Sequence, residues 1–253
     1  MIKHRSSFVL IAYFVCVVLF ASCDNQGGDH FVLNAFEQNS IHEAQTKNYA
    51  LYASSIVESK AADASKHVYH DMDIALRFPQ ISYSNDYAEY DEDIESHINR
   101  VLFAQSIGNE ENFLVNRDNR ELVEFETNYT ITMANDDMFS VKYYGHIYSI
   151  SHAISFCYGT TVNAVTGEIA EVSDYIAIDD SLVALINNGS VEYFSAPEYD
   201  KATVERAVSE FIENQSIVPH QNNCFYISDD RINLIIPVNQ GNRNYVILSI
   251  EVN

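Results

Sequence analysis

The sequence is poor in basic residues. It contains 14 Lys and Arg residues against 36 Asp and Glu residues, which gives a formal net charge of −22 at pH 7. A surface with this charge repels the phosphates of nucleic acids and anionic lipid headgroups. The composition therefore argues against nucleic-acid binding and favours a cationic partner. The alternative is that the acidity only keeps the protein soluble.

Sequence motifs of several enzyme classes are also missing. The chain has no Gly-x-Ser-x-Gly element for a serine nucleophile and no glycine-rich loop for phosphates. No Cys and His stand in a recognisable protease context. The acidic stretch from Asp86 to Glu95 lacks the glycine that a calcium-binding EF-hand loop requires. We therefore predict no catalytic residues, no metal site and no cofactor.

No apolar run is long enough for a typical membrane-spanning helix, which needs about 20 residues. The longest run, Phe8–Phe20, follows the basic residues Lys3 and Arg5 and ends at small residues before Cys23. This order is typical of a bacterial export signal, and a Cys at the cleavage point is typical of a lipoprotein. We predict that residues 1–22 are a lipoprotein signal peptide. Lipid on Cys23 would then anchor the chain to the cell membrane on its extracytoplasmic side.

Cysteine is scarce as well, with four residues in the chain. Cys16 would leave with the signal peptide and Cys23 would carry lipid, so Cys157 and Cys224 would remain in an oxidising compartment. They could form a disulfide there. Both lie in apolar, strand-like runs, where Cys is often a buried free thiol. The sequence leaves both alternatives open.

The remaining chain divides into a polar beginning and a patterned domain. Residues 23–71 are expected to be a tether, with a helix allowed from Ile41 to Ala62 by the loose helical spacing of apolar residues. Residues 72–253 are expected to be an α+β domain, mainly antiparallel sheet with a few packed helices. It could consist of two halves, about 72–135 and 136–253.

Alternating apolar residues predict the strands, and apolar residues at three- and four-residue steps predict the helices. A polar Asn135-Asp136-Asp137 turn is expected to join two strands as a hairpin. The predicted strands are 72–83, 122–133, 138–150, 152–165, 224–227, 233–238 and 245–252, and the predicted helices are 86–107, 180–186 and 200–214.

A series of short motifs has a recognisable order along the domain. They are Phe78-Pro79-Gln80-Ile81, Ile98-Asn99, the Tyr-rich run Tyr143–Tyr148, His152, Thr166-Gly167, Val172–Ile176, Phe225–Asp230 and Ile232–Val238. In this order and spacing the chain resembles the extracytoplasmic domain shared by RsiV, a lysozyme-sensing anti-sigma factor, and the non-catalytic N-terminal region of PdaC-type peptidoglycan deacetylases. The resemblance implies an α+β fold and a cell-envelope setting. It does not imply deacetylase activity.

These observations predict a membrane-anchored, non-enzymatic lipoprotein that binds or senses an envelope ligand. The ligand would be a peptidoglycan fragment or a cationic protein such as lysozyme. The expected ligand-binding residues are Tyr143, Tyr144, His146, Tyr148 and His152. Two alternatives are an envelope hydrolase that uses His146, His152 and the nearby Asp174, and a purely structural lipoprotein.

Overall fold

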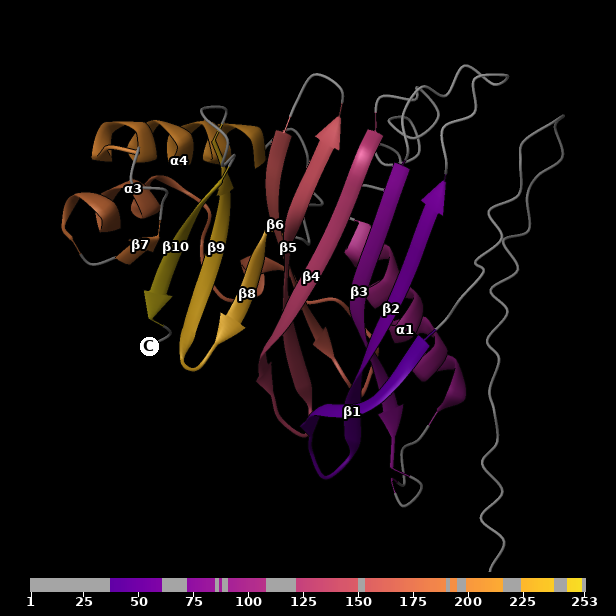
Figure 1. Ribbon diagram of the computed structural model, residues 1–253. Coiled ribbons are helices and arrows are strands. Elements are labelled where there is room, and N and C mark those ends of the chain that lie inside the picture. The colour runs from indigo at the N-terminus through magenta and orange to yellow at the C-terminus, as the bar shows by residue number, and fades with distance from the viewer. Residues whose placement is uncertain are drawn as a thin grey trace, which may run out of the picture. The chain divides into compact units, whose positions relative to one another are not determined.

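The computed structural model describes residues 37–60, 72–84, 87, 91–107, 122–149, 153–189, 192–194, 199–215, 224–238 and 245–251. All of these residues lie in one compact unit, Leu33–Asn253. Within them, a six-stranded and a four-stranded sheet are accompanied by α-helices (Figure 1). The predicted α+β class with mainly antiparallel sheets is confirmed.

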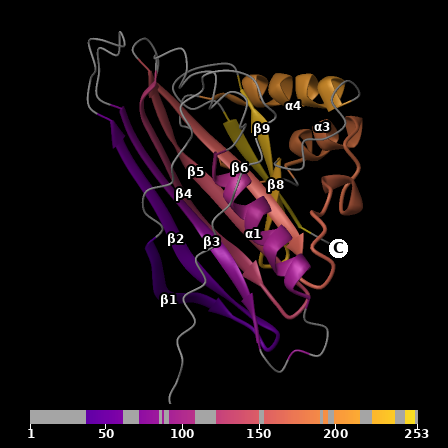
Figure 2. The same ribbon diagram turned by 90° about the vertical axis from the view of Figure 1, so that its right-hand side faces the viewer.

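The first sheet has the strand order β1-β2-β3-β4-β5-β6. Its strands are β1 (Glu37–Gln45), β2 (Tyr49–Lys60), β3 (Met72–Tyr83), β4 (Leu122–Ala134), β5 (Met138–Ser149) and β6 (Ala153–Asn163). β3 and β4 are parallel, and the other neighbours are antiparallel. Helix α1 (Glu92–Ile107) lies on one face of this sheet (Figure 2). Its Ile98 and Leu102 are fully buried in the core that the helix and the sheet enclose.

The expectation of a tether with a helix between Ile41 and Ala62 is wrong for the described residues. Residues 37–60 form β1 and β2, and β2 pairs with β3 along its whole length. The folded domain therefore starts before residue 72. Residues 23–36 and 61–71 lie outside the described part of the chain.

The division into halves at residues 135 and 136 is also wrong. Asn135 closes the predicted β4–β5 hairpin, because its side-chain oxygen accepts hydrogen bonds from the N–H groups of Asp137 and Met138 at 3.0 and 2.9 Å. Both strands of this hairpin belong to the first sheet, which continues to Asn163. The change from one sheet to the other comes after that residue.

Asn99 of α1 hydrogen-bonds to the backbone of β3 where the pairing of β3 with β4 has ended. That pairing covers Asp73 to Leu76. Beyond Pro79, the Ile81 N–H donates to Asn99 Oδ1 at 2.8 Å, and Asn99 Nδ2 donates to the Ile81 carbonyl at 3.1 Å. The amide thus replaces a neighbouring strand for one residue. This gives the Ile98-Asn99 pair a structural role, with Ile98 in the core and Asn99 on the strand.

We expect Asn99→Ala to lower the free energy of unfolding by about 1–3 kcal/mol, because it leaves two backbone groups of a buried residue without partners. Urea unfolding of the variant measures this loss. Arg100→Ala is the matched control, since Arg100 is exposed on the same helix and its removal should change stability by at most about 0.5 kcal/mol. Equal stability of the two variants would contradict the role of Asn99.

The second sheet has the order β7-β10-β9-β8. Its strands are β7 (Glu192–Phe194), β8 (Phe225–Ser228), β9 (Arg231–Pro237) and β10 (Tyr245–Glu251). The 3-10 helix η2 (Val172–Asp174), α3 (Asp180–Asn187) and α4 (Lys201–Gln215) contribute to its core on one face. Alternate residues of β9 fall into this core (Ile232, Leu234 and Ile236), whereas Ile235 belongs to a small cluster on the other face.

Strand β8 packs against the face of the first sheet opposite α1. Thr132 Oγ1 of β4 donates to the Ile227 carbonyl at 2.6 Å, and the Ile227 N–H donates to Ser140 Oγ of β5 at 2.9 Å. Gly159 of β6 lies directly beneath the backbone of Phe225. Hydroxyl groups of one sheet therefore satisfy backbone groups of the other.

The structure shows Cys157 and Cys224 as free, buried thiols, so the disulfide alternative is not realised. Cys157 packs with Tyr226, Ile235 and Ile247 between the sheets, whereas Cys224 belongs to the core on the helix-covered face of the second sheet. Because the two thiols lie in different clusters, they do not meet. Burial raises the pKa of each to about 12, which keeps both protonated at neutral pH.

Among the described residues, no helix combines the length and the apolar character that crossing a bilayer requires.

Candidate functional site

The side chains of β5 alternate between the core and the open face of the first sheet, as in any strand. Phe139, Val141 and Tyr143 are fully buried beneath α1. The even-numbered residues 142, 144, 146 and 148 point to the opposite face. The open face therefore displays Tyr144, His146 and Tyr148, three of the residues expected to bind a ligand.

Tyr143 is not part of this face, which corrects its assignment as a ligand-binding residue. Its side chain is fully buried, and its hydroxyl donates to the Leu102 carbonyl of α1 at 3.0 Å. Burial raises the pKa of this phenol well above its usual value. Tyr143 thus stabilises the packing of α1. His152, the remaining candidate, lies outside the described residues.

Tyr144 and Tyr148 are unusually accessible aromatic side chains. Their exposed fractions are 40% and 43%, and with Val57 they make up the large exposed hydrophobic residues of the described chain. The ring of His146 lies between them in sequence and contacts Tyr148 edge-on, with 4.8 Å between the ring centroids. Exposed aromatic rings gathered on one strand are typical of contact surfaces.

An open groove of about 500 Å³ lies beside Tyr144 where the two sheets meet. Three tyrosines, three small hydroxyl residues and one lysine line it, namely Tyr144, Tyr226, Tyr245, Thr130, Thr132, Ser228 and Lys142. Lys142 Nζ lies 6.0 Å from the ring centroid of Tyr144 and 5.4 Å from that of Tyr226. In the described part of the chain, no carboxylate forms an ion pair with this ammonium group.

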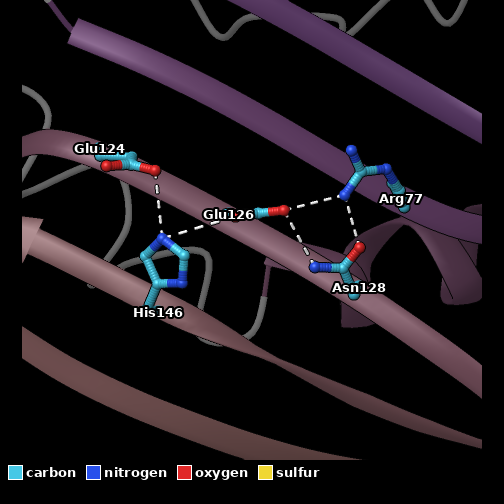
Figure 3. A network of polar contacts seen from close by, with 5 residues as sticks. All are labelled: Arg77, Glu124, Glu126, Asn128 and His146. Atoms are coloured by element: carbon cyan, nitrogen blue, oxygen red, sulfur yellow. Dashed lines mark hydrogen bonds and ion pairs between the residues drawn. The ribbon is translucent and has the colours of Figure 1, made fainter.

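A polar network occupies the same face on the other side of Tyr144 (Figure 3). His146 Nε2 lies 3.1 Å from Glu124 Oε1 and 3.5 Å from Glu126 Oε2. The other oxygen of Glu126 accepts hydrogen bonds from Asn128 at 3.1 Å and from Arg77 at 2.9 Å. Together with His146, these two groups hold the pKa of the Glu126 carboxyl below its usual value, and Asn128 has the largest effect.

The sequence predicted no metal site, yet the ligand atoms of Glu124, Glu126 and His146 lie within 4.8 Å of one another. The two acids lie two residues apart in β4 and so share a face, which is visible in the sequence. Their meeting with His146 depends on the register that pairs Glu126 with His146 across β4 and β5. Tyr226 and Tyr245 were missed for a similar reason, because they reach the groove from the second sheet.

Asp174, which the hydrolase alternative requires, serves a local structural role. Its Oδ2 accepts the Glu171 N–H at 3.0 Å, and the Glu171 side chain in turn caps the first turn of η2. A carboxylate that satisfies free backbone donors at a helix start needs no catalytic function to explain it. The described residues therefore do not support Asp174 as a catalytic acid.

Comparisons with known proteins assign no family to the chain. No family model matches the chain, and no curated protein matches it. Among solved structures, the chain is similar to a crystal structure of a member of the DUF3298 family from Bacteroides fragilis, with 12% sequence identity and a TM-score of 0.47 over 79% of this chain and 90% of that one. That protein belongs to a family named for a domain of unknown function. At this identity and TM-score, the likeness says nothing about the function of this chain.

Proposed function

We propose that this protein is a membrane-anchored lipoprotein of the cell envelope whose domain binds a peptidoglycan fragment without catalysis. The observation that carries the proposal is the groove beside β5, where the rings of Tyr144 and Tyr226 lie close to the ammonium group of Lys142 and Tyr245 also lines the wall. The exported location follows from the signal-like residues 1–22 and Cys23. The resemblance to the RsiV and PdaC extracytoplasmic domain agrees with an envelope ligand.

The groove has the chemistry that a sugar with an acidic substituent requires. Aromatic rings offer apolar faces to the C–H groups of a sugar ring and lose little conformational entropy on binding. The Thr130 and Ser228 hydroxyls can donate hydrogen bonds to sugar oxygens and accept them from sugar hydroxyls, whereas Thr132 can only accept, because its proton is donated to the Ile227 carbonyl. Lys142 is a cation in a chain of net charge −22, and it can pair with the carboxylate of a muropeptide.

A second candidate ligand is a cationic protein such as lysozyme. The net charge of −22 favours it, because an acidic surface raises the rate of encounter with a basic partner. Tyr148 and Glu124, which are 43% and 45% exposed, would supply contacts next to the groove. Binding of this kind weakens strongly with salt, whereas stacking on tyrosine does not.

Calorimetry of the chain in detergent against muropeptides and lysozyme, at low and moderate salt, tests the proposal. We expect muropeptide binding that Tyr144→Ala weakens about tenfold, which is the usual loss for an aromatic contact at the centre of a site. Val57→Ala is the matched control, because Val57 is 68% exposed on β2 and does not line the groove.

Three outcomes would count against the proposal. If muropeptides gave no heat of binding, the proposal of a glycan ligand would be wrong. If only lysozyme gave heat, and this binding weakened with salt, the ligand would be the cationic protein instead. Equal losses in Tyr144→Ala and Val57→Ala would remove the groove as the site. Cleavage of muropeptides that disappears in His146→Ala would show an enzyme instead of a binding protein.

A further inference from the structure

A cluster of three side chains lies outside the residues that line the groove, namely Glu124, Glu126 and His146. Glu124 and Glu126 project from β4, and His146 projects toward both from β5 (Figure 3). The side chains are 45%, 28% and 30% exposed, so the cluster is open to solvent on one side. We propose that these three residues bind a divalent transition-metal ion of the zinc type.

The spacing of the ligand atoms suits tetrahedral coordination. Zinc binds imidazole nitrogen and carboxylate oxygen at about 2.0–2.2 Å, which places neighbouring ligand atoms of a tetrahedron about 3.3–3.6 Å apart. His146 Nε2 lies 3.1 Å from Glu124 Oε1 and 3.5 Å from Glu126 Oε2. The ligand oxygens of Glu124 and Glu126 lie within 4.8 Å of each other, so the two carboxylates must move together by up to about 1.3 Å for all three atoms to reach one ion. The proton at Nε2, if present, leaves when the metal enters.

The neighbouring residues hold one ligand in place. Arg77 and Asn128 both donate to Glu126 Oε1, which leaves Oε2 directed at His146. Metal-binding carboxylates are commonly fixed by hydrogen bonds of this kind from residues that do not touch the ion. The Arg77 guanidinium reduces the negative charge of the cluster but does not occupy the space between the three ligand atoms.

The ligand types favour a transition metal over magnesium or calcium. Imidazole together with carboxylate suits zinc and its neighbours, whereas magnesium and calcium take six or more oxygen ligands. Three protein ligands leave a fourth coordination position open. His146 lies two residues from Tyr144 on the same face, about 7 Å along the strand, so this position would be next to the groove.

Isothermal titration calorimetry of the full chain in detergent, without a histidine tag, tests the site with zinc chloride at neutral pH. We expect one zinc ion per chain with a micromolar dissociation constant, and a rise in Tm when zinc is present. His146→Ala and the conservative Glu124→Gln should each weaken binding at least tenfold. His97→Ala should have no effect, because His97 is exposed on α1, away from the cluster.

Glu124→Gln preserves the size of a surface side chain, so this variant is expected to fold. A Tm measured without zinc checks the folding of each variant. Binding of one zinc ion that depends on both His146 and Glu124 supports the site. Absence of one-to-one binding, equal affinity in the cluster variants, or equally tight binding of magnesium would each overturn it. None of these results depends on muropeptide binding, so the two proposals fail separately.

Discussion

Replacing Gly159 by Ala is expected to lower the free energy of unfolding by about 3 kcal/mol, because it forces the two sheets apart. A Cβ at this position would overlap the carbonyl group of Phe225 and come within 2.8 Å of the Tyr226 nitrogen. These are backbone atoms of β8, so no side-chain rotation relieves the overlap. Moving β8 would also break the hydrogen bonds that Ile227 makes to Thr132 and Ser140.

Urea unfolding followed by circular dichroism measures this effect, and Gly189→Ala is the control. Gly189 has a φ of 68°, so Ala is strained there by about 1 kcal/mol, but no atom lies within 4 Å of its new Cβ. A larger loss at Gly159 than at Gly189 would support the close contact of β8 with β6. If Gly159→Ala lost no more than Gly189→Ala, the contact between the sheets as described would be wrong.

The strands with regular alternation could be predicted from the sequence. Apolar residues at alternate positions over most of β4 and β5 face the core beneath α1, and the polar Asn135-Asp136-Asp137 turn fixes where the two strands reverse. The helices α1 and α4 were predicted for the same reason, since each buries one face only. Local chemistry therefore determined these elements, whereas the grouping of strands into two sheets depended on distant contacts.

β2 was missed because its alternation changes phase within the strand. Tyr49 and Leu51 face the core with odd numbers, and Ile56 faces the same core with an even number. The paired strand β3 changes phase at the matching place, between Phe78 and Ile81. A period of two is lost at such a change, and the apolar residues on either side then resemble a loose helical pattern.

The candidate site was predictable only in part. The Tyr-rich run in β5 located the open face, but it did not separate Tyr143 from Tyr144. The alternation of Phe139 and Val141 in the same strand would have placed Tyr143 in the core. The groove and the acid–histidine cluster each combine residues from different strands, so they depend on register and on the packing of one sheet against the other.

Replacing Cys23 by Ser is expected to abolish lipid attachment to the chain. In a lipoprotein the lipid is attached to the sulfur of the Cys at the cleavage point, and a serine hydroxyl does not accept the lipid in its place. Cells grown with labelled palmitate should therefore label the unchanged chain and show only background label for Cys23→Ser. This effect is all or none, because Cys23 is the predicted attachment point.

Cys16→Ser is the matched control, since Cys16 lies within the apolar run of the predicted signal and would be removed with it. It should keep the full label. Label that persists in Cys23→Ser, or an unlabelled parent chain, would remove the anchor from the proposed function. Muropeptide binding would then be unaffected, because the groove residues lie between Thr130 and Tyr245, far along the chain from the anchor. In the proposed function, the anchor would determine where the domain works, and the groove would determine what it binds.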